Sequence, residues 1–295
     1  MQELARRMEE TAALVGQDLD RRQAAVSGPR GRVIDAMRAG SLNGGKRLRP
    51  FLLLETAALF EVPQRRALNA AVALEMVHCY SLVHDDLPAM DDSDLRRGQP
   101  TVHKLYDDAT AILAGDGLLT EAFAVLAEEA THPDPAVRCS LVGSLAQAAG
   151  AAGMVGGQMI DLSPEREHLD LAGITELQAL KTGRLIEYAC EAGAILGAAS
   201  AAERDALLTY ARALGLAFQI ADDLLDVEGT TADLGKPAQA DAALGKATFV
   251  GQLGVEGARA RAQELVAEAQ QSLTQVPGDT AMLGTTAAFV VERRS

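Results

Sequence analysis

Two clusters of aspartates carry the clearest chemical signal in this chain of 295 residues. They span Asp85–Asp92 and Asp222–Asp226, each at the end of an otherwise apolar stretch. On a helix, Asp222 and Asp226 would share a face, where a like-charged pair costs roughly 0.2–0.5 kcal/mol. Carboxylates are preferred ligands of hard divalent cations, and Mg²⁺ usually combines one or two of them with substrate phosphates. We therefore favour a Mg²⁺ site that also binds a diphosphate over acidic helix ends that are merely solvated.

The loop after the first aspartates can bring them together. Pro88 should end the helix near Asp85, so Asp91 need not follow helical phase and can fold back toward Asp85. An EF-hand is a poor alternative. Counted from Asp91, the sixth position is Arg96 rather than glycine, and the twelfth is Val102 rather than glutamate.

A run of basic residues beside glycines is the second signal. Gly44–Pro50 reads Gly-Gly-Lys-Arg-Leu-Arg-Pro and precedes a predicted helix. Backbone N–H groups at a helix start, together with Lys46, Arg47 and Arg49, would make an anion site. Gly40–Lys46 also matches the nucleotide-binding pattern G-x-x-x-x-G-K, but Arg47 replaces the Ser or Thr and no strand precedes it. We discard that alternative.

Two arginines and a histidine accompany the first cluster. Arg96 and Arg97 follow it directly and would either neutralise the aspartates or hold one anionic ligand each; both alternatives stay open. His78 lies two turns before Asp85 on the same predicted helix face. Its role is undecided on its own.

Helical spacing of apolar residues recurs along the chain, whereas strand-type alternation is nearly absent. The predicted helices are 50–60, 67–86, 107–129, 136–157, 173–198, 202–227, 243–253 and 256–273. No linker or charge block separates them, which predicts one all-α domain over residues 1–295. Many helices are apolar on more than one face, as expected of central helices or of helices that meet a partner.

Charge and composition exclude several classes of protein. The 27 basic and 41 acidic residues give a net charge of −14, so the overall field will not attract nucleic acid or an anionic membrane. Three widely spaced cysteines make no disulfide framework. Met1–Asp20 shows no signal-peptide pattern, and apolar runs such as Val155–Ile160 are short for a membrane span. We expect a cytoplasmic protein without membrane insertion.

The motifs taken together resemble those of one family, the trans-isoprenyl diphosphate synthases. The resemblance extends from about Gly44 to Lys246 and includes Lys181-Thr182-Gly183. It implies a bundle of roughly ten or more helices around a central, largely apolar cavity. It also implies a Mg²⁺-dependent prenyltransferase that condenses isopentenyl diphosphate with an allylic diphosphate by ionisation, condensation and elimination. The family is usually homodimeric through helices like 67–86.

The resemblance also implies roles for individual residues. Isopentenyl diphosphate would be held by Gly45, Lys46, Arg49, His78 and Arg97. Three Mg²⁺ ions, with Mn²⁺ as the alternative, would be bound by Asp85, Asp86, Asp91, Asp222 and Asp226. The allylic diphosphate would be held by Arg96, Lys181, Thr182, Gln219, Lys236 and Lys246. The catalytic group would be Lys181, Thr182, Gln219, Asp85 and Asp222, with oxygens near the Lys181-Thr182-Gly183 break and on Gln219 directed at the allylic cation. Gln239 departs from the family pattern, which often has glycine there.

The residues before the first cluster bear on product length. Tyr80 lies five residues before Asp85, about 7.5 Å along a helix. By resemblance, Tyr80 and Ser81 would form the floor that stops growth at C15, which favours farnesyl diphosphate over a C20 product, geranylgeranyl diphosphate. A terpene cyclase would not need a second diphosphate site, and a non-catalytic subunit commonly lacks one aspartate motif.

Overall fold

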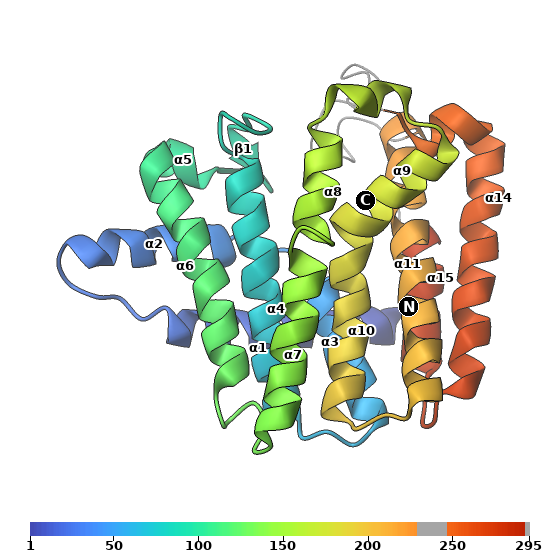
Figure 1. Ribbon diagram of the computed structural model, residues 1–295, viewed down its shortest axis with the longest axis horizontal. Helices are drawn as coiled ribbons and strands as arrows, with labels where there is room; N and C mark the ends of the chain where they lie inside the picture. Colours follow the sequence, from blue (N-terminus) through green and yellow to red (C-terminus); the bar gives the residue numbers. More distant parts are fainter. Residues whose placement is uncertain (229–246, 293–295) are drawn as a thin grey trace. The chain divides into compact units, whose positions relative to one another are not determined.

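The computed structural model describes residues 1–228 and 247–292 (Figure 1). Helices make up most of this part of the chain, and the only strands in it are β1 (Leu95–Arg96) and β2 (Gln99–Pro100), paired antiparallel. The predicted all-α class is confirmed. The chain divides into two compact units, which we call the N-terminal unit (Gln2–Gly143) and the C-terminal unit (Ser144–Ser295 with Met1). A single domain around one cavity stays a prediction.

The N-terminal unit is built around one buried helix. Its helices are α1 (Gln2–Arg22), α2 (Pro29–Ser41), α3 (Leu48–Leu59), α4 (Gln64–Asp85), α5 (Val102–Leu105) and α6 (Asp108–Ala127). Helix α4 packs along α6, α3 and α2 and lies beside α6 in Figure 1. Residues 69–77 of α4 are all buried, the mark of a core helix. This helix carries Asp85 at its C-terminal end.

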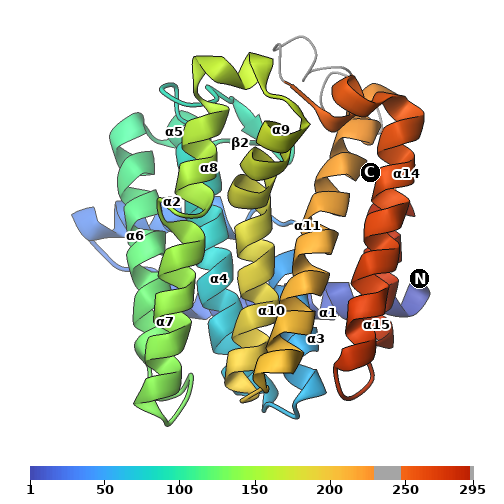
Figure 2. The same ribbon diagram turned by 45° about the vertical axis from the view of Figure 1, so that its right-hand side comes forward.

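The C-terminal unit is organised around the longest helix. Helix α7 (Pro135–Ala149) crosses the boundary into this unit, and the elements after it are α8 (Met154–Asp161), η1 (Pro164–His168), α9 (Leu171–Gln178), the π-helical turn η2 (Ala179–Gly183), α10 (Arg184–Leu196), α11 (Ala201–Glu228), α14 (Phe249–Ser272), η3 (Leu273–Gln275) and α15 (Ala281–Glu292). Helix α11 packs along α14, α10 and α15, and Figure 2 shows α11 and α14 side by side. The Tyr210 hydroxyl donates to the Leu283 carbonyl (2.9 Å), which ties α11 to α15. Helix α11 carries the second aspartate cluster near its C-terminal end.

Several predicted helices differ from the observed ones. The segments predicted over 136–157 and 173–198 are interrupted, by a turn at Gly150–Gly153 and by η2. The two segments predicted over 243–273 meet at Gly254, which has a left-handed φ of 69° within α14. The predicted segments do not include α1, α2, α5 or α15. Glycine can adopt the φ that a helix forbids, which explains the break within α14.

Candidate active site

Helix α4 ends at Asp85, and the following loop returns to that end. The Asp91 N–H donates to the Asp85 carbonyl (2.8 Å), and the Ser93 N–H donates to the Asp86 carbonyl (3.2 Å). The fold-back predicted from Pro88 is therefore confirmed. Asp85 is half-buried and Asp91 is exposed, so two aspartates of the first cluster meet through their backbones at an accessible helix end.

The middle aspartate of this cluster is held by an arginine. Arg96 donates from Nε to both carboxylate oxygens of Asp86 (2.8 and 2.9 Å) and from Nη2 to Oδ1 (2.7 Å). Burial raises the pKa of Asp86, and Arg96 opposes that rise. Of the two roles that the sequence left open for Arg96, the structure shows one: it neutralises Asp86. Roles of Asp86 as a metal ligand and of Arg96 as a diphosphate ligand stay predictions.

The donors at both clusters are suited to Mg²⁺. Among the described residues, no three His, Cys, Asp or Glu side chains converge into a metal cluster of their own. Mg²⁺ commonly takes one or two protein carboxylates and completes its shell with phosphate oxygens and water. Asp85 with Asp91 in the N-terminal unit, and Asp222 with Asp226 in the C-terminal unit, offer carboxylate oxygens of that kind. The residues present therefore fit the ion.

The glycine loop before α3 closely approaches an arginine from the β-hairpin. Gly44 and Gly45 have left-handed φ values of 86° and 109°. The Arg97 guanidinium donates to the Asn43 side-chain oxygen (3.0 Å) and to the Gly44 carbonyl. A Cβ on Gly45 would lie 2.5 Å from Arg97 Cζ, so a larger residue there would displace the guanidinium. The left-handed φ is what requires glycine here, because the guanidinium is the end of a flexible side chain that can move aside.

A cationic cluster continues from this loop onto α4. Arg49 Nη1 lies 3.4 Å from His78 Nε2. Burial and then the charges of Arg49, Arg97 and Arg47 lower the pKa of His78 well below its usual 6.5. The structure therefore brings Gly45, Arg49, His78 and Arg97 into one neighbourhood of positive potential, as an anion site requires. Lys46 is exposed on the same loop.

We expect His78 to make folding stability fall in acid. Because its pKa is lowered in the folded state, the unfolded chain takes up the proton first, and stability falls below about pH 6.5 by up to ~1.4 kcal/mol per pH unit. Urea unfolding of wild type and His78→Gln between about pH 7.5 and 5.5 measures the contribution of His78 to the pH dependence of the free energy of unfolding. Inorganic pyrophosphate should reduce this loss of stability in acid, because it offsets the positive charges around His78. Equal pH slopes for the two proteins would contradict the assignment.

Arg47 corrects one sequence-based expectation. The motif predicts an anion ligand at Arg47, as at Lys46 and Arg49, but the Arg47 side chain is only 3% exposed and pairs with Glu75 (Nη1 to Oε1, 2.5 Å). A carboxylate 28 positions along the chain captures the guanidinium inside the protein. The local motif could not reveal that partner.

The predicted floor residues lie on α4, on the C-terminal side of the buried residues 69–77. Tyr80 is 7% exposed, and its ring meets the His84 ring edge-on at 5.7 Å. Ser81 is half-buried and donates from Oγ to the His78 carbonyl (2.8 Å). His84 is in turn 3.0 Å from the Ile112 carbonyl of α6. Tyr80 therefore packs against a side chain of its own helix that is anchored to α6.

In the C-terminal unit, the Lys181-Thr182-Gly183 motif forms the π-helical turn η2. Lys181 pairs with Asp161 at the end of α8 (Nζ to Oδ2, 2.5 Å). Thr182 is half-buried. A π turn shifts the helical hydrogen-bond pattern and is frequent at functional sites. The helix that apolar spacing predicts over 173–198 is thus interrupted by a bulge, at the break that the family resemblance implies, while the roles of both side chains stay predictions.

Gly157 lets α8 approach that bulge, and we expect Gly157→Ala to disturb it. An added Cβ would lie 2.3 Å from the Lys181 backbone nitrogen, where no side chain can yield. Overpacking of this kind costs about 1–3 kcal/mol. Gly284→Ala on α15 is the matched control, because its Cβ would meet nothing within 4 Å. Thermal unfolding should show a lower melting temperature for the first variant only; equal values would contradict the close contact.

The second aspartate cluster lies in the last two turns of α11. Asp222 and Gln219 are half-buried, and Asp226 is 3% exposed. Asp223, between them in sequence, accepts a hydrogen bond from the Phe249 N–H (2.8 Å) at the start of α14. Asp223 thereby joins two helices. The predicted ligands Lys236 and Lys246, and Gln239 with them, lie outside the described residues.

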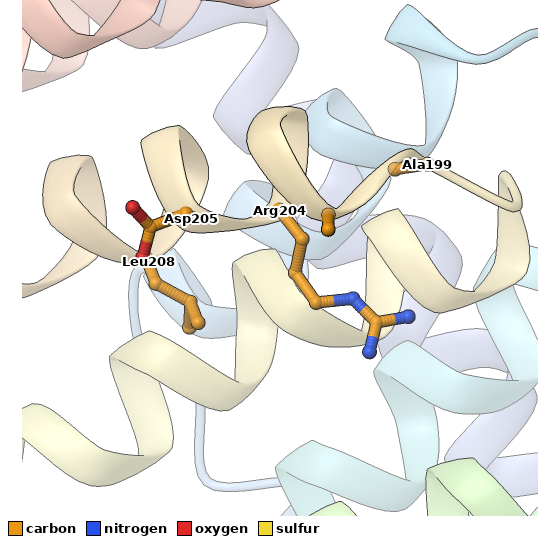
Figure 3. A pocket seen from close by; sticks show the side chains of 5 residues that line it. Ala199, Arg204, Asp205 and Leu208 are labelled. Atoms are coloured by element: carbon orange, nitrogen blue, oxygen red, sulfur yellow. The ribbon is translucent and has the colours of Figure 1, made fainter.

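A surface hollow of about 420 Å³ lies elsewhere in the C-terminal unit, lined by Ala199, Ala201, Arg204, Asp205 and Leu208 (Figure 3). Asp205 precedes Asp222 by 17 positions on the same helix, which is about 25 Å along its axis. None of the predicted site residues lines this hollow. It is not part of the candidate site.

Two residues that contact the site were given no role by the motifs. Asp161 holds Lys181, and Glu75 holds Arg47. Glu75 had a detectable signal, since a glutamate inside the apolar stretch Ala73–Val77 must find a buried partner. The identity of that partner needed the fold.

Comparisons with known proteins agree with these features. A model of the polyprenyl synthetase family matches residues 32–280. The farnesyl diphosphate synthase of Escherichia coli (strain K12) is 46% identical over 271 residues, covering 88% of this chain and 89% of that protein. Geranylgeranyl pyrophosphate synthase 9, chloroplastic, of Arabidopsis thaliana is 42% identical over 268 residues (88% and 74%). The apo crystal structure of an FPP/GFPP synthase from Zymomonas mobilis is 45% identical, with a TM-score of 0.89 and coverage of 98% and 99%. This chain belongs to the polyprenyl synthetase family.

Proposed function

We propose that this protein is a farnesyl diphosphate synthase that condenses isopentenyl diphosphate with dimethylallyl or geranyl diphosphate. The observation that carries the proposal is the cationic cluster of Arg49, His78 and Arg97 beside the Gly44–Gly45 loop. It lies in the same unit as the first aspartate cluster and supplies an anion site separate from those carboxylates. A terpene cyclase, which binds one diphosphate, has no need of such a second site. Relatives named farnesyl diphosphate synthase support the same activity.

The isopentenyl diphosphate site is assigned to the N-terminal unit. Arg49 and Arg97 donate charge-assisted hydrogen bonds to the diphosphate oxygens, and exposed Lys46 adds a third positive charge. His78 is neutral before the ligand arrives, because burial and the neighbouring arginines lower its pKa. Neutral imidazole can donate one N–H to an oxygen without further like-charge repulsion. These groups hold the homoallylic alkene in place for attack.

The allylic diphosphate is assigned to the aspartate clusters and Lys181. When bound, Mg²⁺ neutralises the negative charge that grows on the diphosphate as the carbon–oxygen bond breaks. Lys181 is held in place by Asp161, and its ammonium group has further N–H donors for the diphosphate oxygens. Oxygens of Thr182 and Gln219 face the developing allylic cation. The alkene attacks, a proton leaves the new carbon chain, and the released pyrophosphate accepts it, so the chain needs few acid–base side chains.

The number of carbons in the product is assigned to the floor residue Tyr80. Buried Tyr80, backed by the anchored His84 ring, would stop the growing chain after two additions, at C15. The competing candidate is a synthase of longer products. It is favoured by the Arabidopsis relative, named a geranylgeranyl pyrophosphate synthase, and by the Zymomonas structure, described as an FPP/GFPP synthase.

A homodimer is part of the proposal, but its interface is assigned to a different helix than expected. Helix α4 is covered by the chain's own helices, so it offers little surface for a second copy. Helix α6 has an exposed apolar face on which Ile112 and Leu113 are 44% and 57% exposed. Leu119 and Phe123 follow two and three turns after Ile112 and are half-buried, and the exposed Asp116 lies between Ile112 and Leu119 on this face. Light scattering should give the mass of two chains; the mass of one would overturn the dimer.

The same apolar character bears on localisation. Asp108–Ala127 and Pro135–Asp161 are long and apolar enough by composition to cross a membrane, with mean hydropathies of 1.5 and 1.3. A core helix of a water-soluble protein meets the same criterion, and α6 packs along α4 and α2. A dimer interface explains its remaining apolar face. We therefore assign the protein to the cytoplasm.

An activity assay tests the proposal. Purified protein should release pyrophosphate only when isopentenyl diphosphate, an allylic diphosphate and Mg²⁺ are all present. Release from the allylic substrate alone would indicate a cyclase or hydrolase. Binding of both substrates without release would indicate a non-catalytic subunit.

A further inference from the structure

Arg47 lies between two residues assigned to the isopentenyl diphosphate site, but its own side chain is buried inside the protein. Its side chain is 3% exposed, whereas Lys46 is exposed and Arg49 is half-buried at His78. Its Nη2 donates to the carbonyl of Ser41, the last residue of α2 (2.5 Å). Its Nη1 donates to Glu75 in the middle of α4 (2.5 Å). One guanidinium therefore joins α2, the basic loop and α4.

The backbone at Arg47 depends on such an anchor. Arg47 has φ 49° and ψ 40°, the left-handed conformation that residues with a side chain rarely adopt. It immediately precedes α3, and its carbonyl accepts the Phe51 N–H (3.0 Å) in the first turn. The left-handed backbone at Arg47 turns the chain between Lys46 and the first turn of α3, which carries Arg49. The buried contacts of the Arg47 side chain thus fix the backbone positions from which the side chains of Lys46 and Arg49 extend.

Glu75 also balances the charge beneath the site. Its side chain is 2% exposed, in a helix stretch that is otherwise apolar. Arg49 from α3, His78 from α4 and Arg97 from the hairpin lie in the same neighbourhood. The Cys79 thiol, 3.6 Å from Arg47, stays neutral because burial raises its pKa to about 12. The carboxylate of Glu75 therefore offsets Arg47 and leaves the charges of Arg49 and Arg97 to the ligand.

We propose that Arg47 and Glu75 are positioning residues for isopentenyl diphosphate: their buried ion pair fixes the loop that presents Lys46 and Arg49. Neither touches the substrate. This inference rests on the proposed function, because it presumes that the cationic cluster binds that diphosphate.

The test separates positioning from folding. Glu75→Gln leaves a buried guanidinium without its counter-charge, and this variant alone could fail to fold. The double variant Arg47→Met with Glu75→Met removes both charges at similar volume, a replacement that is often neutral for stability. We expect it to raise KM for isopentenyl diphosphate about 10- to 100-fold, because the loop loses its anchor. The kcat and the KM for the allylic substrate should change less than about twofold.

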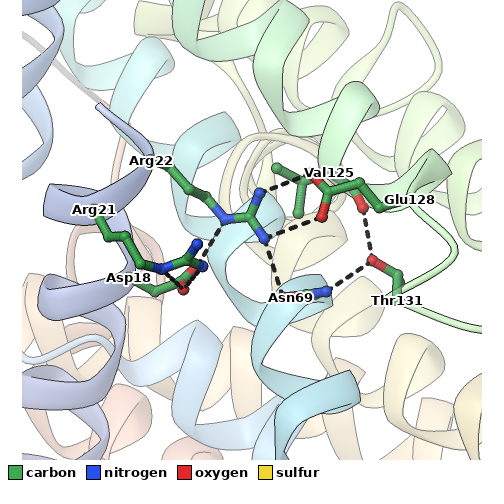
Figure 4. A network of polar contacts seen from close by, with 7 residues as sticks. All are labelled: Asp18, Arg21, Arg22, Asn69, Val125, Glu128 and Thr131. Atoms are coloured by element: carbon green, nitrogen blue, oxygen red, sulfur yellow. Dashed lines mark hydrogen bonds and ion pairs between the residues drawn. The ribbon is translucent and has the colours of Figure 1, made fainter. Parts of the chain in front are cut away.

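The matched control is another buried arginine network in the same unit (Figure 4). Arg22 of α1 donates to Asp18 (2.7 Å), Glu128 (2.8 Å) and Asn69 (3.1 Å), and its side chain is 9% exposed. Arg22→Met removes comparable buried contacts without touching the basic loop. It should leave KM for isopentenyl diphosphate unchanged. A rise equal to that of the double variant would overturn the proposal in favour of general loosening.

Binding of inorganic pyrophosphate to the apoprotein, measured by calorimetry, keeps this test independent of turnover. If wild type forms no product, the proposed function fails, and the pyrophosphate affinity alone decides the inference. Weaker binding by the folded double variant would support positioning by the ion pair. Wild-type affinity, or a wild-type KM in an active enzyme, would overturn it.

Discussion

Asp85→Asn and Asp222→Asn should each lower kcat by at least about 10³-fold. Both side chains are half-buried at helix ends, so an amide of the same shape should leave the fold intact. The loss is expected because an amide cannot supply the negative charge that holds a divalent cation on the leaving diphosphate. Steady-state turnover measures kcat, and Mg²⁺-dependent pyrophosphate binding by calorimetry reports the site without chemistry.

Two further variants make that prediction specific. Asp86→Asn removes the carboxylate to which Arg96 donates its hydrogen bonds. Besides any effect on kcat, it should therefore lower the free energy of unfolding by about 1–3 kcal/mol. Asp205→Asn changes an exposed carboxylate earlier on α11 and should leave both turnover and stability unchanged. Wild-type turnover in Asp85→Asn combined with Asp222→Asn would refute the metal site.

Tyr80→Ala should lengthen the product from C15 to C20 or beyond. The ring is 7% exposed and is backed by His84, so its removal opens space that the remaining side chains cannot fill. The change should also cost about 3–5 kcal/mol of stability, as for other large buried rings. Product analysis by mass spectrometry, made at a temperature where the variant is folded, reports the length.

Matched variants distinguish a floor from a loosened core. Tyr80→Phe keeps the ring and should keep a C15 product. Leu74→Ala creates a cavity at a fully buried position on another face of α4 and should destabilise without changing length. Longer product from Leu74→Ala as well would show that general loosening, rather than Tyr80, sets the length.

Local patterns in the sequence were sufficient for the elements and for part of the site. Apolar spacing predicted α4 and α11, and Pro88 predicted the fold-back of Asp91 onto Asp85. These features depend on residues close in sequence. The π turn at Lys181 is a different case, because a break was expected there but its form depends on α8 packing against it through Gly157.

Long-range pairs could not be predicted in this way. Arg47 and Arg49 belong to one motif, but Glu75 draws the first inside while the second lies beside His78. Arg96 and Arg97 are adjacent, yet one binds Asp86 and the other binds the Gly44 loop. In each case a partner ten or more positions away decides the direction of the side chain. Residue type alone leaves that choice open.

The most direct test of the central claim is the length of the product. Purified protein should be given dimethylallyl diphosphate, excess isopentenyl diphosphate and Mg²⁺, and the products identified by mass spectrometry. The account predicts accumulation of a C15 diphosphate, farnesyl diphosphate. A C20 or longer endpoint would keep the reaction but refute Tyr80 as the floor, and the absence of any prenyl product would contradict the proposed function itself.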